Sequence, residues 1–205
     1  MRPSGKPYVS FVAALAVSAF AAAVHAAPSE CDAVVGNLVV NCGFETGTFA
    51  GWTQSGNTGF TGVSTGAAHS GTFGAFFGPV GSLGFISQNL VTVPGTSYDL
   101  SFWLRSPGGT PNEFEALFNG AVLVDIVNAG AFPYTQFTFS GLTATGASTE
   151  LRFGFRQDPD FWNFDDVVVV SSIISQVPEP ASLALIALGL VGLSAWRRRN
   201  RPNRN

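Results

Sequence analysis

The chain has few charged residues, and almost none in its central part are basic. Asp, Glu, Lys and Arg make up 11% of the 205 residues, whereas hydrophobic residues make up 46%. Between residues 27 and 176, only Arg105, Arg152 and Arg156 oppose twelve acidic residues, so this part has a formal net charge of −9. Such a charge should repel nucleic acid and anionic lipid, and it suits calcium or neutral sugars better.

Residues for common catalytic designs are also scarce. His69 is the only histidine after residue 26, and no serine or cysteine nucleophile motif stands near it. No glycine-rich loop leads into a helix, so a nucleotide site has no support. Glu113 and Glu115 are two apart on one strand face, whereas glycoside hydrolysis needs carboxylates opposed across a cleft. We therefore expect a protein that is not an enzyme.

The chain opens with an apolar segment that has the features of a signal peptide. Arg2 and Lys6 make the start positive, and Phe11–Val24 is a run of Ala, Val, Leu and Phe. Val24-His25-Ala26 fits the small-residue rule for cleavage, which predicts a signal peptide over residues 1–26. A retained membrane anchor is the alternative.

Cysteine occurs only twice, at Cys31 and Cys42, both just after the predicted cleavage site. Export leads to an oxidising compartment, where a disulfide between two such residues is expected. An unstrained disulfide would contribute roughly 2–4 kcal/mol and would hold the mature N-terminus to the first strand. Two free thiols are the alternative, and a metal site from two cysteines alone would lack ligands.

No segment between residues 27 and 176 keeps a helical period for three turns, and alternation with period two recurs instead. It is clearest in 98–105, 151–156 and 137–139, and around Asn119-Gly120, a strong signal for a hairpin. Further strand candidates are Leu38–Val40, Thr72–Phe77, Phe85–Leu90 and Asp166–Val170. Many short strands separated by Gly and Pro predict an all-β domain over 27–176, an antiparallel β-sandwich or jelly roll.

The C-terminus resembles the PEP-CTERM protein-sorting signal. It contains Val177, Pro178, Glu179 and Pro180, then an apolar stretch over 181–196, then three arginines, Arg197–Arg199. The resemblance implies a sorting signal over 177–205 that an exosortase, a membrane protease, cleaves near the motif. Fifteen residues from Ser182 span about 23 Å as a helix, shorter than a bilayer core of about 30 Å. The two prolines leave an extended strip beside the membrane, and the arginines should stay cytoplasmic. A permanent tail anchor is the alternative.

The central domain resembles a galactose-binding-like carbohydrate-binding module. The segments that carry the resemblance are "NLVVNCGFETGTFAGW" from Asn37, "AHSGTFGAFFG" from Ala68 and "FWNFDDVVVV" from Phe161. Cys42 stands where such modules commonly have glycine or another small residue. The order of the segments supports the fold, but the fold hosts many functions and does not identify a ligand.

The same resemblance implies a structural calcium ion where the first and last strands meet. Its ligands would be Glu45 and Asp166, with backbone carbonyls near Ser70 to Thr72, and hard oxygen ligands suit Ca²⁺. Asp165 could replace Asp166 as the ligand. The alternative is a pair of solvated acids at a strand edge.

Aromatic residues near polar ones provide a hypothetical sugar surface, because exposed rings stack on sugars while polar groups bind hydroxyls. Its residues would be Trp103, Arg105, Asn112, Glu113 and Trp162. The alternative is that both sheet faces are buried or covered by loops, and for Trp52 burial is the favoured interpretation.

The sequence thus predicts an exported surface or matrix protein that contacts extracellular polysaccharide without catalysis. Its partners would be an exosortase-like protease, polysaccharide and, before processing, the inner membrane, with the domain facing the periplasm. A glycan-active enzyme and a purely structural surface protein are the alternatives.

Overall fold

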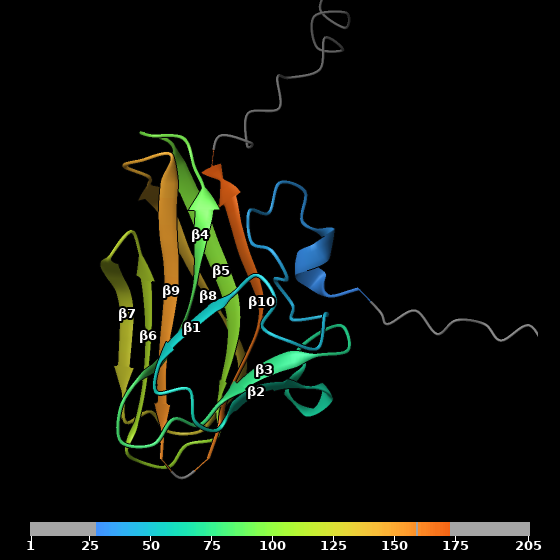
Figure 1. The fold of residues 1–205 in the computed structure, drawn as a ribbon, viewed down its shortest axis with the longest axis vertical. Helices are drawn as coiled ribbons and strands as arrows, with labels where there is room; N and C mark the ends of the chain where they lie inside the picture. Colours follow the sequence, from blue (N-terminus) through green and yellow to red (C-terminus); the bar gives the residue numbers. More distant parts are fainter. Residues whose placement is uncertain (1–27, 159, 173–205) are drawn as a thin grey trace, which may run out of the picture.

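The computed structural model describes residues 28–158 and 160–172, which form a sandwich of β-strands (Figure 1). The predicted signal peptide, the sorting motif 177–180 and the apolar stretch 181–196 lie outside the described residues. Within the described ranges, no helix has the length and hydropathy needed to cross a membrane.

The strands form two five-stranded antiparallel sheets, as predicted for a β-sandwich. Sheet one has the order β1 (Thr53–Gly56), β4 (Gly84–Val91), β9 (Ser148–Gln157), β6 (Asn112–Phe118) and β7 (Ala121–Val127). Sheet two has the order β2 (Thr61–Ser64), β3 (Gly74–Phe77), β10 (Trp162–Ser171), β5 (Ser97–Ser106) and β8 (Phe132–Thr143). Two short 3-10 helices, η1 (Glu30–Ala33) and η2 (Thr65–Ala67), precede β1 and β3.

Phenylalanine fills the space between the sheets. Strand alternation turns Phe102 of β5 and Phe153 of β9 inward, where both are fully buried. The rings of Phe77 and Phe155 stack across the two sheets with centroids 3.8 Å apart. Buried aromatic rings contribute both apolar area and preferred ring geometry, so these contacts fix the distance and register of the sheets.

The predicted hairpin at Asn119-Gly120 is confirmed. Asn119 has a φ of 53° and Gly120 a φ of 75°, and the turn joins β6 to β7. Positive φ at both central residues is what a type I′ turn requires.

Two sequence predictions near the N-terminus have different outcomes. The Cys31–Cys42 disulfide is confirmed and fastens η1 to the segment that precedes β1. Leu38–Val40 was predicted as a strand, and this is wrong. The segment runs beside β10, where the backbone N–H of Leu38 donates to Val169 O at 2.9 Å, but no continuous ladder forms.

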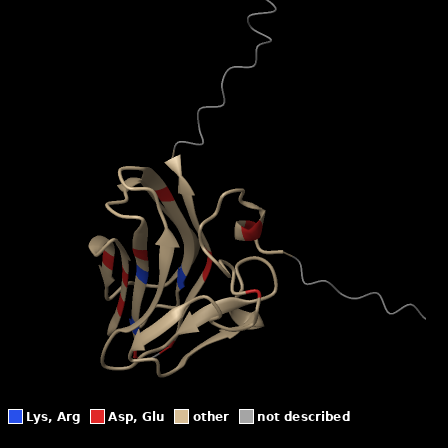
Figure 2. Ribbon diagram, turned by 45° about the horizontal axis from the view of Figure 1, so that its top comes forward, with Lys and Arg blue, Asp and Glu red and all other residues tan. Residues whose placement is uncertain are grey.

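Charged residues are sparse on the surface, and most of them are acidic (Figure 2). Each of the three arginines has an acidic residue, an amide or an aromatic ring beside it. Arg156 pairs with Asp158, Arg105 donates to Asn163, and Arg152 lies over the ring of Phe85. The domain therefore presents more free negative charge than positive charge.

Candidate glycan-binding site

The structure does not bring the five predicted sugar-binding residues together. Trp162 and Asn112 lie in the interior, with 0% and 1% exposure. The Trp162 ring packs near Phe114, and Asn112 exchanges hydrogen bonds with the backbone of Ala129. Neither side chain can stack on or bind a glycan from this position. The prediction that Trp162 and Asn112 bind sugar is therefore wrong, and both residues stabilise the interior.

The other three predicted residues lie on opposite sides of the sandwich. Trp103 and Arg105 are on the outer face of sheet two, whereas Glu113 is on the outer face of sheet one. One face of the half-buried Trp103 ring is covered by His69, with ring centroids 3.9 Å apart. Of the predicted set, Arg105 is the residue that lines a concave surface.

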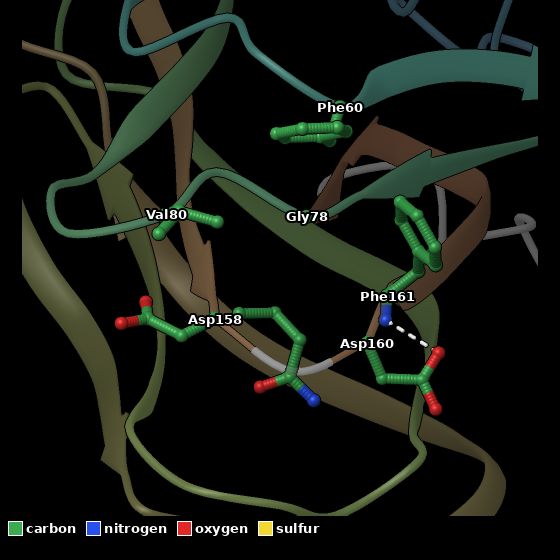
Figure 3. Close-up of a pocket in the computed structure, with 7 residues that line it drawn as sticks. Phe60, Gly78, Val80, Asp158, Asp160 and Phe161 are labelled. Carbon is green, nitrogen blue, oxygen red and sulfur yellow. Dashed lines mark hydrogen bonds between the residues drawn. The ribbon is translucent and has the colours of Figure 1, made fainter.

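A small pocket opens at one end of the sandwich, where three segments distant in sequence meet (Figure 3). It encloses about 190 Å³. Its lining residues are Phe60, Gly78, Val80, Gln157, Asp158, Asp160 and Phe161. In Figure 3, the rings of Phe60 and Phe161 stand on either side of the chain at Gly78. Both rings reach solvent, with 69% and 38% exposure.

The backbone at Gly78 explains why the two rings stand there. The N–H of Gly78 donates to Phe60 O at 2.9 Å. A Cβ at position 78 would lie 2.7 Å from the Phe161 ring, so only glycine permits this approach. Phe60 has a φ of 54°, a conformation that costs energy for a bulky residue. Phe44 has a similar φ of 57° in the core, so what distinguishes Phe60 is its exposure to solvent.

The polar groups of the pocket are mostly acceptors. Arg156 donates two hydrogen bonds to Asp158 and lowers the pKa of its carboxyl group, which the N–H of Gly81 also approaches. Asp160 accepts from the N–H of Phe161 and forms no ion pair with any described residue. Gln157 is fully buried, and its Oε1 has no hydrogen-bond partner among the described residues.

A shallower pocket of about 450 Å³ continues from this one along the outer face of sheet two. The two share Asp160 and Phe161, and the second adds Arg105 and Asn163 among other residues. Arg105 Nη1 donates to Asn163 Oδ1 at 3.0 Å, which fixes the guanidinium over the sheet. We call the two pockets together the Phe161 groove. Its aromatic residues, Phe60, Phe76 and Phe161, are not among the predicted site residues.

The outer face of sheet one is a second polar surface. Arg152 lies 3.7 Å above the Phe85 ring, and its buried Nε has no partner among the described residues. Gly154 leaves room for this arrangement, since a Cβ there would lie within 3 Å of both Glu115 and Phe85. Burial raises the pKa of Glu115, and the nearby Arg152 opposes that rise. Glu113, from the predicted set, is on this face.

The predicted calcium ligands, Glu45 and Asp166, accept hydrogen bonds from neighbouring protein groups, and Glu30, His69 and Asp166 together could hold a metal ion. The carboxylate of Glu45 accepts the backbone N–H groups of Thr72 and Phe73. The carboxylate of Asp166 accepts from Ser70 Oγ, His69 Nδ1 and the N–H of Cys31. Backbone N–H groups, the His69 ring and the Ser70 hydroxyl therefore lie beside these carboxylates, and the calcium ion stays a prediction.

A bulge in β10 places two acids side by side at this position. The register with β5 shifts between Asp165 and Val168, and Asp166 has a φ of 51°. Both carboxyl groups are buried, and Asp165 accepts from the backbone N–H groups of His69 and Ser70. Burial and then the charge of Asp166 raise the pKa of Asp165 from 3.8 to about 8. Asp165 is therefore mostly protonated at neutral pH.

The two sheets and the Phe-filled core define an all-β sandwich domain. Residues 36–169, more than half of the chain, match the family described as Carbohydrate binding domain, and the chain belongs to this family. Residues 176–199 match the PEP-CTERM protein-sorting motif. Among curated proteins, no sequence matches the chain.

Solved structures share the fold at low sequence identity. TmCBM61, determined in complex with β-1,4-galactotriose, is 20% identical, with a TM-score of 0.56 over 66% of this chain and 99% of that one. The CBM22-1–GH10 modules of Clostridium thermocellum xylanase 10B are 19% identical, with a TM-score of 0.51 over 66% of this chain. Tailspike protein 4 of bacteriophage CBA120 is 15% identical, with the same TM-score and coverage of this chain. The match spans only 29% and 21% of the latter two chains.

Proposed function

We propose that the chain is an exported surface protein that binds extracellular polysaccharide, without cleaving it, at the Phe161 groove. The carbohydrate-binding domain supports the ligand class, and the PEP-CTERM motif supports export and processing at a membrane. An exosortase-like protease would cleave near Pro178–Pro180. Before that step the domain would face the periplasm from the inner membrane, and afterwards it would reach the cell surface or the medium.

The observation that carries the proposal is the pair of exposed rings, Phe60 and Phe161, beside a pocket of polar acceptors. Sugar rings have an apolar face that stacks on aromatic side chains and hydroxyl groups that donate to acceptors. Sites for small ligands typically combine aromatic walls with a few placed polar groups. Arg105 and Asn163 extend the polar surface beyond the first sugar unit.

The state of two carboxyl groups supports binding over glycoside hydrolysis. That reaction needs a protonated acid and a second carboxylate opposed across the bond. Arg156 lowers the pKa of Asp158, which is the opposite of the shift that a catalytic acid needs. Asp165 holds a proton at neutral pH, but it is fully buried and does not line either pocket.

The proposal can be tested on a glycan array with the purified exported protein. Phe161→Ala should reduce binding at least about fivefold, because aromatic stacking contributes about 1–3 kcal/mol per ring in comparable contacts. Phe85→Ala is the matched control on sheet one and should retain binding. Loss of binding in the control alone would move the site to sheet one, and release of reducing sugar would contradict a binding role.

The sorting part of the proposal has its own test. Mass spectrometry of the mature protein should find a C-terminus near Pro178–Pro180. A full-length protein that ends at Asn205 would instead support a permanent anchor.

A further inference from the structure

We propose that the Phe161 groove selects glycans that carry free amino groups, that is, hexosamine units in the ammonium form. The inference rests on the proposed function and specifies its ligand. It depends on two properties of the groove: the unbalanced negative charge of Asp160 and the two exposed aromatic rings, Phe60 and Phe161.

The negative charge belongs to Asp160. Asp158 is neutralised by Arg156, and Arg105 is held by Asn163, whereas Asp160 is exposed and unpaired among the described residues. The domain as a whole has twelve acids against three arginines, and Figure 2 shows few basic positions among the acidic ones. This field attracts an ammonium group and repels the carboxylates of uronic acids.

The rings of Phe60 and Phe161 can contact both the ammonium group and the apolar C–H face of a hexosamine unit. Aromatic faces attract cations as well as apolar C–H groups, and at exposed sites the cation contributes about 0.5–1 kcal/mol. The volume of about 190 Å³ is smaller than the pockets of about 300–1,000 Å³ that hold drug-sized ligands. We infer that the pocket holds one sugar unit and that the rest of the chain lies along Arg105 and Asn163.

Calorimetry on the purified exported protein at pH 5.5 tests the inference. The probes are β-1,4-linked oligomers of glucosamine, N-acetylglucosamine and glucose, together with a uronic acid oligomer, all of equal length. The glucosamine oligomer should bind about tenfold more tightly than the neutral oligomers, and the uronic acid oligomer most weakly. The glucosamine preference should shrink as NaCl is raised to 0.5 M, since salt screens exposed charges.

Two variants test whether Asp160 causes the preference for glucosamine oligomers. Asp160→Asn should reduce glucosamine affinity about two- to fivefold, the range for an exposed ion pair, and leave glucose affinity within twofold. Asp125→Asn removes an equal charge from the exposed surface of β7 and should change neither affinity. Equal losses in both variants would assign the preference to overall charge and overturn the inference.

The remaining outcomes separate this inference from the proposed function. Binding of neutral oligomers that is sensitive to Phe161→Ala, with no gain from the amino group, overturns the inference and leaves the proposed function standing. No binding of any oligomer contradicts both.

Discussion

Asp165→Asn should remove a fall in stability that the wild type undergoes as the pH rises. Asp165 is fully buried, and burial together with Asp166 raises the pKa of its carboxyl group to about 8. In the unfolded chain the same group ionises at its ordinary pKa of 3.8. Between these two values the folded state binds more protons than the unfolded state, so the free energy of unfolding falls as the pH rises.

The size of the effect follows from the shift. One proton contributes at most about 1.4 kcal/mol per pH unit, so a shift of about four units amounts to at most about 6 kcal/mol. This stability is fully present below pH 3.8 and is lost as the pH rises to about 8. For a domain of this size, each kcal/mol corresponds to about 2–4 °C in melting temperature.

Asp165→Asn removes the titration but also removes one acceptor oxygen. Asp165 accepts from three backbone N–H groups, those of His69, Ser70 and Asp166, and an asparagine cannot accept from all of them. This loss should cost about 1–3 kcal/mol at every pH. At pH 4 the wild type has lost well under about 1 kcal/mol through this titration, whereas at pH 8 it has lost most of the effect. The variant should therefore be less stable than the wild type at pH 4 and more stable at pH 8.

Urea denaturation at pH 4, 6 and 8 in the presence of EDTA measures the pH at which the two stabilities become equal, with the exposed Asp125→Asn as the control. A wild-type stability that does not fall between pH 4 and 8 would refute the reasoning. So would a loss in Asp165→Asn that is the same at every pH.

Other predictions concern the disulfide, a glycine and calcium. Replacing Cys31 and Cys42 with serine should lower the free energy of unfolding by about 3 kcal/mol, the loop-closure value for a separation of 11 residues. Reductant should lower the free energy of unfolding of the wild type by a similar amount, and with it the melting temperature. Gly84→Ala should destabilise by about 1–3 kcal/mol or more, because its Cβ would lie 1.9 Å from Asn57 O, whereas Gly146→Ala, with no contact under 3.5 Å, should be nearly neutral. EDTA should leave the melting temperature unchanged if N–H groups, not an ion, satisfy Glu45 and Asp166. A drop that Glu45→Ala abolishes would restore the calcium ion.

The alternation of residues along each strand predicts most of the fold, and it could also have predicted which residues of the candidate site face solvent. Phe164 is a core residue of β10, so the alternation places Trp162 inside and Phe161 outside. The predicted sugar surface includes Trp162, which has the larger ring, whereas Phe161 is the residue whose place in the alternation faces solvent. The same rule places Asn112 inside, because it shares a face with Phe114.

Other features could not be predicted from the local pattern. β1 and β2 are four residues each, with no buried residue, so they have no alternation to detect. The bulge at Asp166 interrupts the period of β10 and buries two adjacent acids, which a strict alternation forbids. The groove depends on Phe60, Gly78 and Phe161, which lie far apart in sequence and meet only in the folded sandwich.

The most direct test of the central claim is the affinity of the purified exported protein for glycan oligomers, measured for the wild type and for Phe161→Ala. The account predicts measurable binding by the wild type and a loss of at least about fivefold in the variant, with both proteins equally folded. Equal affinity in the two proteins, or no affinity in either, would contradict it.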